Sequence, residues 1–380
     1  MKTPIFGGYH HFCYHLGGPF MARETTNVAT PARPCCHRRV PSQDRALGIH
    51  RLGGTAKRHR LSLMLYVATA LVAVSALSSN PAYSEPSSSF RLVEGVESAP
   101  TPMAGGVNIP WIHGAADCSR STDPPLQTHQ YTPHTFILRE SKCLNYEGNF
   151  LYLLLGTQKA LLLDTGSQPQ HPQQILPLRE TIEGLMQQWT AAHGIALLEL
   201  IVAHSHSHAD HVFGDAQFRD RPNTVVVPLD VAGIKQFYNL PNWPDGMTTL
   251  DLGGRLLTIL PTPGHEAAHI AVYDATTQIL FTGDTLYPGL LTVANWPAYR
   301  SSVSALAQFA STNPITAILG AHIEMTRTPR QLYPIGTTFQ PDEHGLSLDV
   351  SHLRELHTAC EAMGNSPHRD VHSNFIIEPR

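Results

Sequence analysis

The chain has 380 residues, of which 42% are hydrophobic, and its formal net charge is −4. This length and apolar content suit one sizeable globular domain with extensions, or two modest domains, and exclude a fibrous or wholly disordered protein. Residues 1–84 hold ten of the 26 basic and two of the 30 acidic groups, so residues 85–380 carry a net charge of −12. Because an acidic body repels phosphate backbones, we expect no nucleic-acid partner.

Residues 1–84 are predicted to be a leader that contains a signal peptide. The basic segment Lys57-Arg58-His59-Arg60 precedes an apolar run at 61–77, and Ala82-Tyr83-Ser84 forms a small-x-small end. This order is typical of a secretory signal that is cleaved near Ser84, which predicts a periplasmic or secreted protein without a stable membrane partner. An uncleaved membrane anchor is the alternative, since 17 apolar residues are close to the minimum for a span. The unusual composition before residue 57 indicates either a long n-region or a wrongly chosen start codon.

The cysteines do not indicate a cysteine-rich zinc finger, because none of the six forms a Cys-x-x-Cys pair. Export would place Cys118 and Cys143 in an oxidising space. There they form either a disulfide or two buried thiols, and Cys360 is left over.

Short strands and helices interleave through residues 135–326, which we predict to be one domain. It follows an irregular N-terminal arm at 85–134, rich in Pro, Ser, Gly and Thr. Apolar runs between turn residues predict the strands 136–139, 150–155, 160–163, 196–203, 224–227, 256–260, 269–273, 279–282 and 317–319. Apolar residues at helical spacing predict helices at 178–193, which Gly194 ends, and at 231–238 and 301–311. In the C-terminal tail, 327–380, we expect a Pro-rich loop and one helix at about 349–363.

Four residues of metal-ligand type lie within six positions, in the run His206-Ser207-His208-Ala209-Asp210-His211. On an extended segment His206 and His208 point the same way, so their imidazoles can reach one ion. A tight turn would aim Asp210 and His211 at a second point nearby. Burying four such side chains without a metal is costly, which disfavours a solvated His-rich loop. The run alone has too few ligands for two ions.

Three further residues of ligand type stand at predicted strand-to-loop junctions. They are His265 after Pro263-Gly264, Asp284 after Gly283, and His322 shortly after Gly320. Each lies near a glycine, which permits a close approach of the backbone. These distant residues are candidates to complete a binuclear site.

The whole pattern resembles the metallo-β-lactamase fold superfamily over about residues 135–325. The resemblance rests on the His-x-His-x-Asp-His run, on the three later residues in that order, and on the upstream Asp164-Thr165-Gly166. It implies an α/β (α+β) fold, a four-layer αββα sandwich with metals at one edge of the sheets. The implied ligands are His206, His208 and His265 for a first metal and Asp210, His211 and His322 for a second, with Asp284 bridging both. Asp164 would bind no metal and would hold a ligand in place by hydrogen bonding.

Two cations a few ångströms apart lower the pKa of a shared water and polarise a carbonyl or phosphoryl oxygen. We therefore expect a metal-dependent hydrolase in which a metal-bridging hydroxide attacks a small ester, thioester, lactone or related substrate. Asp210 would orient the hydroxide or accept its proton. Two Zn²⁺ are expected, because iron-dependent redox members typically carry Glu where His208 stands; iron and manganese are the alternatives.

Two other functions stay open at this point. One is a β-lactamase acting on β-lactam antibiotics, which Asp284 disfavours because such enzymes usually lack an acidic bridge there. The other is a non-catalytic metal-binding protein on the same fold, which the complete ligand set disfavours. Tyr287 is a candidate hydrogen-bond donor to a developing oxyanion or a packed loop aromatic. His269 is a candidate substrate contact or a packed histidine at the sheet edge. The sequence leaves the oligomeric state open.

Overall fold

The computed structural model describes residues 105–107 and 109–380. The predicted leader, its apolar run at 61–77 and the first part of the predicted arm lie outside these described residues. The chain divides into the units Met1–Phe90 and Arg91–Arg380, and every described residue belongs to the second. Within the described part of the chain, no helix combines the length and the apolar content that a membrane span requires.

Six strands form the first sheet and follow one another across it in chain order. The first four are antiparallel neighbours, whereas the last three run parallel. The central strands are buried on both faces, which explains their continuous apolar sequences. The bounds are β1 (Leu126–Thr132), β2 (Thr135–Glu140), β3 (Phe150–Leu155), β4 (Lys159–Leu163), β5 (Glu199–Ala203) and β6 (Thr224–Val226).

β1 corrects the prediction of an irregular arm that reaches residue 134. It pairs antiparallel with β2 at the edge of the first sheet, and Thr128 and Gln130 on one of its faces are exposed. An edge strand with a solvated face carries polar residues, so its sequence lacks the apolar run by which strands were predicted.

The second sheet also has six strands, in the order β13-β12-β10-β9-β8-β7. β10 and β12 are parallel, and the other neighbours are antiparallel. β7 and β13, at the two edges, were not predicted. The bounds are β7 (Thr248–Asp251), β8 (Leu256–Pro261), β9 (Ile270–Asp274), β10 (Ile279–Gly283), β12 (Ala317–Gly320) and β13 (Ser347–Leu348).

The helices begin and end at local sequence signals. α1 ends at Gly194, whose φ of 63° is the left-handed conformation that glycine adopts readily. α4 begins earlier than predicted, because Asn295 caps it by accepting a hydrogen bond from the backbone N–H of Ala298, and Pro297 suits its first turn. The helices are α1 (Leu178–His193), α2 (Ala209–Val212), α3 (Val231–Tyr238), α4 (Trp296–Thr312) and α5 (Val350–Met363), with the 3-10 helices η1 (Cys118–Arg120) and η2 (Phe213–Gln217).

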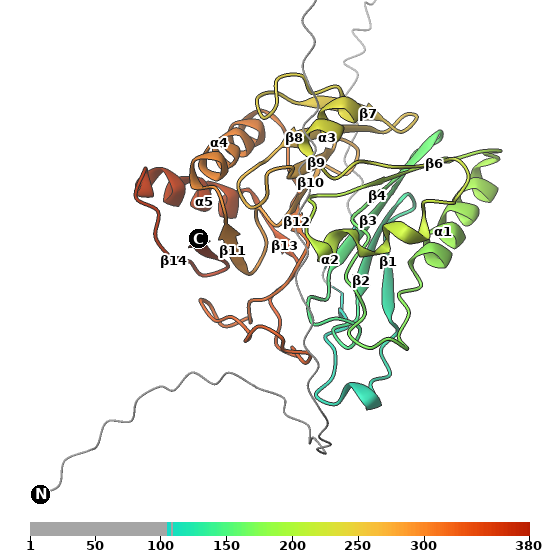
Figure 1. The fold of residues 1–380 in the computed structure, drawn as a ribbon, viewed down its shortest axis with the longest axis horizontal. Helices are drawn as coiled ribbons and strands as arrows, with labels where there is room; N and C mark the ends of the chain where they lie inside the picture. Colours follow the sequence, from blue (N-terminus) through green and yellow to red (C-terminus); the bar gives the residue numbers. More distant parts are fainter. Residues whose placement is uncertain (1–104, 108) are drawn as a thin grey trace, which may run out of the picture. The chain divides into compact units, whose positions relative to one another are not determined.

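Alternate residues along the strands point into different apolar layers, as the pleat requires. In the second sheet, Phe281 packs in the core between the sheets, while Leu280 packs against α4 and α5. In the first sheet, Leu161 packs between the sheets and Leu162 packs against α1. Figure 1 shows α1 beside the first sheet and α4 and α5 beside the second. The predicted αββα sandwich is therefore confirmed.

The C-terminal tail is more than a loop with one helix, and residue 326 does not separate two structural units. β13 completes the second sheet by pairing with β12. A small third sheet has the order β11-β15-β14, in which β11 precedes α4 and the other two strands come from the tail. Its bounds are β11 (Leu290–Val293), β14 (Asp370–Val371) and β15 (Ile376–Pro379).

Of the two alternatives for the paired cysteines, the structure has the disulfide. Cys118, in η1, is bonded to Cys143, which follows β2, while Cys360 is a buried free thiol in α5. The bond fastens the N-terminal arm to the domain.

Candidate metal centre

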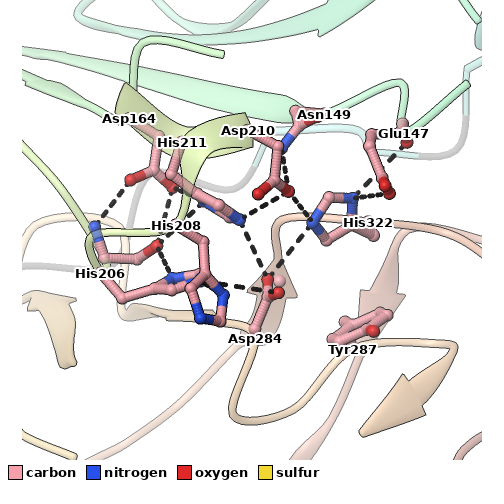
Figure 2. A network of polar contacts seen from close by, with 12 residues as sticks. Glu147, Asn149, Asp164, His206, His208, Asp210, His211, Asp284, Tyr287 and His322 are labelled. Carbon is pink, nitrogen blue, oxygen red and sulfur yellow. Dashed lines mark hydrogen bonds and ion pairs between the residues drawn. The ribbon is translucent and has the colours of Figure 1, made fainter. Parts of the chain in front are cut away.

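The His-rich run leaves the carboxyl end of β5, a buried parallel strand between β4 and β6. Its backbone stays extended up to His208 (φ −65°, ψ 150°) and then turns into the single-turn helix α2. The backbone N–H of His211 donates to the carbonyl oxygen of His208 and closes this turn. Strand, extended segment and turn therefore occur in the expected order, and Figure 2 shows the imidazoles of His206, His208, His211 and His322 close to the carboxylates of Asp210 and Asp284.

Three imidazoles form a first group. Nδ1 of His208 lies 2.9 Å from Nε2 of His206 and 3.0 Å from Nε2 of His265. In a tetrahedral zinc site with Zn–N bonds of about 2.0–2.1 Å, ligand nitrogens lie about 3.3 Å apart. Nδ1 of His265 is anchored 2.7 Å from the carbonyl oxygen of Thr292, which leaves Nε2 directed at the group.

The turn that presents His265 requires glycine at position 264. Gly264 has a φ of 145°, and a Cβ placed there would lie 2.3 Å from the Cα of Tyr299 in α4. Neither the backbone conformation nor the space permits another residue, so the turn packs directly against α4.

A second group contains one carboxylate and two imidazoles. Oδ2 of Asp210 lies 3.2 Å from Nε2 of His211 and 3.4 Å from Nε2 of His322. His322 comes from the loop after β12, so the two sheets contribute ligands to one edge of the sandwich. The side chain of Asp210 is 27% exposed, whereas those of His211 and His322 are buried.

Asp284, at the end of β10, lies between the two groups (Figure 2). Its Oδ2 is 3.5 Å from Nε2 of His265 and 3.9 Å from Nε2 of His206. Its Oδ1 is 3.4 Å from Nε2 of His322 and 3.6 Å from Nε2 of His211. Each carboxylate oxygen thus faces one group, as a bridging ligand would.

The donor set fits two cations. Oδ1 of Asp284 and Nε2 of His211 are both buried, and neither has a hydrogen-bond partner within the described residues. Buried polar atoms without partners are costly, and a bound cation would satisfy both. The structure brings together all seven residues of the expected ligand set, in the expected two groups: His206, His208 and His265, then Asp210, His211 and His322, with Asp284 between them.

Asp164 holds the cluster from behind. Its carboxylate accepts hydrogen bonds from the backbone N–H (2.7 Å) and hydroxyl (2.9 Å) of Ser205, and it lies 3.1 Å from Nδ1 of His211. With Nδ1 of His211 engaged in this way, Nε2 is left for a metal. The residue is buried, and its φ of 67° turns the chain sharply after β4.

Comparison with known proteins agrees with this geometry. Residues 147–322 match the family model of the metallo-beta-lactamase superfamily. Residues 147–322 therefore carry the sequence pattern of the metallo-β-lactamase superfamily.

Members similar in sequence include enzymes named for thioester hydrolysis. A hydroxyacylglutathione hydrolase of Thiobacillus denitrificans is 25% identical over 180 residues, which are 47% of this chain and 61% of that protein. The human acyl-coenzyme A thioesterase MBLAC2 is 27% identical over 185 residues, covering 39% of this chain and 61% of that protein. The matches thus span about three-fifths of these relatives. The solved metallo-beta-lactamase of Pontibacter korlensis has 17% identity and a TM-score of 0.40, over 62% of this chain and 99% of that one.

Several imidazoles of this site have a pKa far from the usual value. Burial and the neighbouring imidazoles hold the pKa of His206 well below its usual value. Burial also opposes charge on His322, but the carboxylates of Asp284 and Asp210 outweigh it and raise its pKa to about 9. They act on His211 in the same way and raise its pKa well above the usual value. Because imidazole binds a metal only in its neutral form, metal loading must displace these protons.

A cavity of about 330 Å³ opens over the cluster. Its floor is made of ligand-type side chains, among them His208, Asp284 and His322. Its walls come from the loop before β3, from β11 and from the C-terminal tail, including residues 332–336. The tail therefore shapes the space in which a substrate would lie.

Of the two candidate substrate contacts, Tyr287 lines this cavity but directs its hydroxyl elsewhere. The hydroxyl donates to the carbonyl oxygen of Leu290 at 2.8 Å and lies 3.2 Å from Oε2 of Glu324. The ring packs 5.5 Å from that of His322. These contacts favour the packed loop aromatic over the oxyanion donor.

Of the two alternatives for His269, the structure has the packed histidine and not the substrate contact. Its side chain is fully buried and does not line the cavity. Nδ1 lies 2.8 Å from Oγ1 of Thr262, and Nε2 accepts a hydrogen bond from the backbone N–H of Asp284. Its ring stacks behind that of His206, with 5.0 Å between centroids. His269 directly precedes the buried strand β9, so its polar atoms find partners in the interior.

Sequence reasoning missed several residues near the site. Asn149 lies with its amide nitrogen 3.5 Å from Oδ2 of Asp210, and Glu147 lies with its carboxylate 4.0 Å from Nδ1 of His322 (Figure 2). Both are in the loop before β3, next to a predicted strand end, which was the available signal. Arg380 also lines the cavity, and no local pattern points to it.

Proposed function

We propose that this chain is an exported di-zinc hydrolase that cleaves a small thioester or a related ester or lactone. The observation that carries the proposal is the position of Asp284, which presents one oxygen to each of two ligand groups. A single metal would need only one of these groups.

Zinc suits the donors that the chain supplies. The first group offers imidazole nitrogen alone, and the second adds a carboxylate oxygen, which are ligand atoms that zinc takes in proteins. His206, His208 and His265 would hold one ion, Asp210, His211 and His322 the other, and Asp284 both.

Two cations held there would supply positive charge that polarises a substrate carbonyl and favours ionisation of water. The residues of the chain orient the ligands and a water molecule. Asp164 and Thr292 fix the imidazoles of His211 and His265 through their Nδ1 atoms. Asp210 has the most exposed carboxylate of the cluster and lines the cavity, so it can orient a water molecule and accept its proton at a carboxylate oxygen.

A thioester substrate is supported by the names of the similar proteins. Both the hydroxyacylglutathione hydrolase and the acyl-coenzyme A thioesterase are named for thioesters. Because loops rather than the fold determine the substrate, this support is an inference from likeness.

The test is hydrolysis by the zinc-loaded protein of a thioester, the matching oxyester, a lactone and a β-lactam. We expect the thioester to be cleaved fastest, and the activity to be lost in Asp210→Ala and His206→Ala. His171→Ala, an exposed histidine outside the cluster, is the matched control. Preference for the β-lactam would overturn the substrate class. Full metal loading without any hydrolysis would favour a non-catalytic metal protein.

Export is supported by the leader pattern and by the Cys118–Cys143 disulfide, since disulfides persist mainly in oxidising compartments. We expect protein recovered from the periplasm or the medium to begin near Glu85. Intact protein found only in the cytosol, with both thiols reduced, would contradict export.

A further inference from the structure

Arg380 lines the cavity over the metal centre. It is brought there by the parallel pairing of β15 with β11, in which Val293 is opposite Pro379. The backbone N–H of Arg380 continues this ladder by donating to the carbonyl oxygen of Val293 at 2.9 Å. The neighbouring Thr292 anchors His265, so β11 both anchors a ligand and, by its pairing with β15, positions the cationic residue.

Two other charged residues that line the cavity, Lys142 and Glu324, already have partners. Nζ of Lys142 donates to the carbonyl oxygen of Tyr146 at 3.1 Å and lies 3.8 Å from Glu343. Glu324 accepts a hydrogen bond from the backbone N–H of Leu290 at 2.7 Å. Both side chains therefore stabilise the wall of the cavity through these contacts.

The side chain of Arg380, in contrast, is exposed, and its guanidinium has no hydrogen bond or ion pair with any residue that the structure describes. A guanidinium presents a planar fork of donors that matches a carboxylate or a phosphate. The net charge of −12 on residues 85–380 repels anions at a distance, so an anionic substrate needs a local attraction in the cavity.

We propose that Arg380 binds an anionic group, carboxylate or phosphate, on the substrate that the metal centre hydrolyses. This rests on the proposed hydrolase function. The anion is held at the wall beside β11 while the scissile carbonyl lies over the ligand cluster. The side chain thereby selects substrates that carry a negative charge on the part remote from the bond that is cut.

The kinetic test uses one acyl group on three thiols. These are glutathione, which offers carboxylates, coenzyme A, which offers phosphates, and a short neutral thiol. For Arg380→Ala we expect the KM of the preferred anionic substrate to rise about 10- to 100-fold, with kcat little changed, as for loss of a charged hydrogen bond. In Arg380→Lys we expect a smaller rise in this KM. The KM of the neutral thioester should be unchanged in both variants. The thiol whose KM rises identifies carboxylate or phosphate.

Arg354→Ala is the matched control, since Arg354 is an exposed arginine of α5 that does not line the cavity. An equal rise in KM in both variants would mean a general charge effect and would overturn the proposal. So would an unchanged KM in Arg380→Ala, or an equal loss with the neutral thioester.

A binding measurement separates this proposal from the proposed function. S-methylglutathione and S-methyl-coenzyme A are thioethers that cannot be hydrolysed, and calorimetry gives their Kd for each variant. We expect weaker binding of one of them to Arg380→Ala by the same factor as in KM. If the wild-type protein hydrolyses none of the thioesters, the proposed function fails, while this Kd comparison still decides whether Arg380 holds an anion.

Discussion

The substitution Asp164→Asn tests whether the hydrogen bonds of Asp164 orient His211 in the metal centre. Asparagine is the right replacement, because it tolerates the φ of 67° that alanine does not. Its Oδ1 can still accept from the backbone N–H of Ser205. Its amide nitrogen, however, replaces the oxygen that lies 2.9 Å from Oγ of Ser205 and 3.1 Å from Nδ1 of His211.

Loss of a charged acceptor for buried donors costs about 1.5–3 kcal/mol of the free energy of unfolding. Loss of a residue that orients a metal ligand typically lowers metal affinity about 10- to 100-fold. We therefore expect both effects in Asp164→Asn. Urea denaturation measures the first, and zinc titration against a competing chelator measures the second.

The matched control is Asp215→Asn. Asp215 is also buried and also accepts two hydrogen bonds, from Oγ1 of Thr165 at 2.9 Å and from Nε2 of His204 at 2.8 Å, but it contacts no residue of the ligand set. It should lose stability while keeping zinc affinity. If both variants lose stability and neither loses zinc affinity, the role assigned to Asp164 is refuted.

Three further predictions concern the scaffold. Cys118→Ser removes a bond that spans 25 residues and should lower the free energy of unfolding by about 3 kcal/mol; an unchanged urea midpoint under oxidising conditions would contradict this. Burial raises the pKa of Glu140 from 4.5 to about 8, so the folded state keeps a proton that the unfolded state releases. Stability should therefore fall as the pH rises from 4.5 to 8, and Glu140→Gln should show a smaller fall across that window. Glu343→Ala leaves the fully buried Arg139 without its two 2.6 Å hydrogen bonds and should cost about 3–5 kcal/mol; a loss below about 1 kcal/mol would show that water reaches the guanidinium.

Much of the site could be predicted because its signals are local. The run from His206 to His211 follows an apolar strand, and Gly194 and Gly264 stand where the backbone needs glycine. Seven ligand-type residues at strand ends meet at one edge of the sandwich because the carboxyl ends of neighbouring parallel strands point the same way.

The features that could not be predicted from the sequence depend on contacts between distant segments. β1 is a polar edge strand, so its sequence resembles a loop until its pairing with β2 is known. The tail pairs with β11 through β15, and this register alone brings Arg380 to the cavity. For His269 the sequence left two alternatives, a substrate contact and a packed histidine, and the burial of the neighbouring strand β9 decides for the second.

The most direct test of the binuclear site is the zinc content of the purified protein and of Asp284→Ala. We predict about two zinc ions per chain in the wild-type protein, a clear loss in Asp284→Ala, and full retention in Asp215→Asn. A wild-type protein without stoichiometric metal, or an Asp284→Ala variant that keeps both ions at wild-type affinity, would contradict the account.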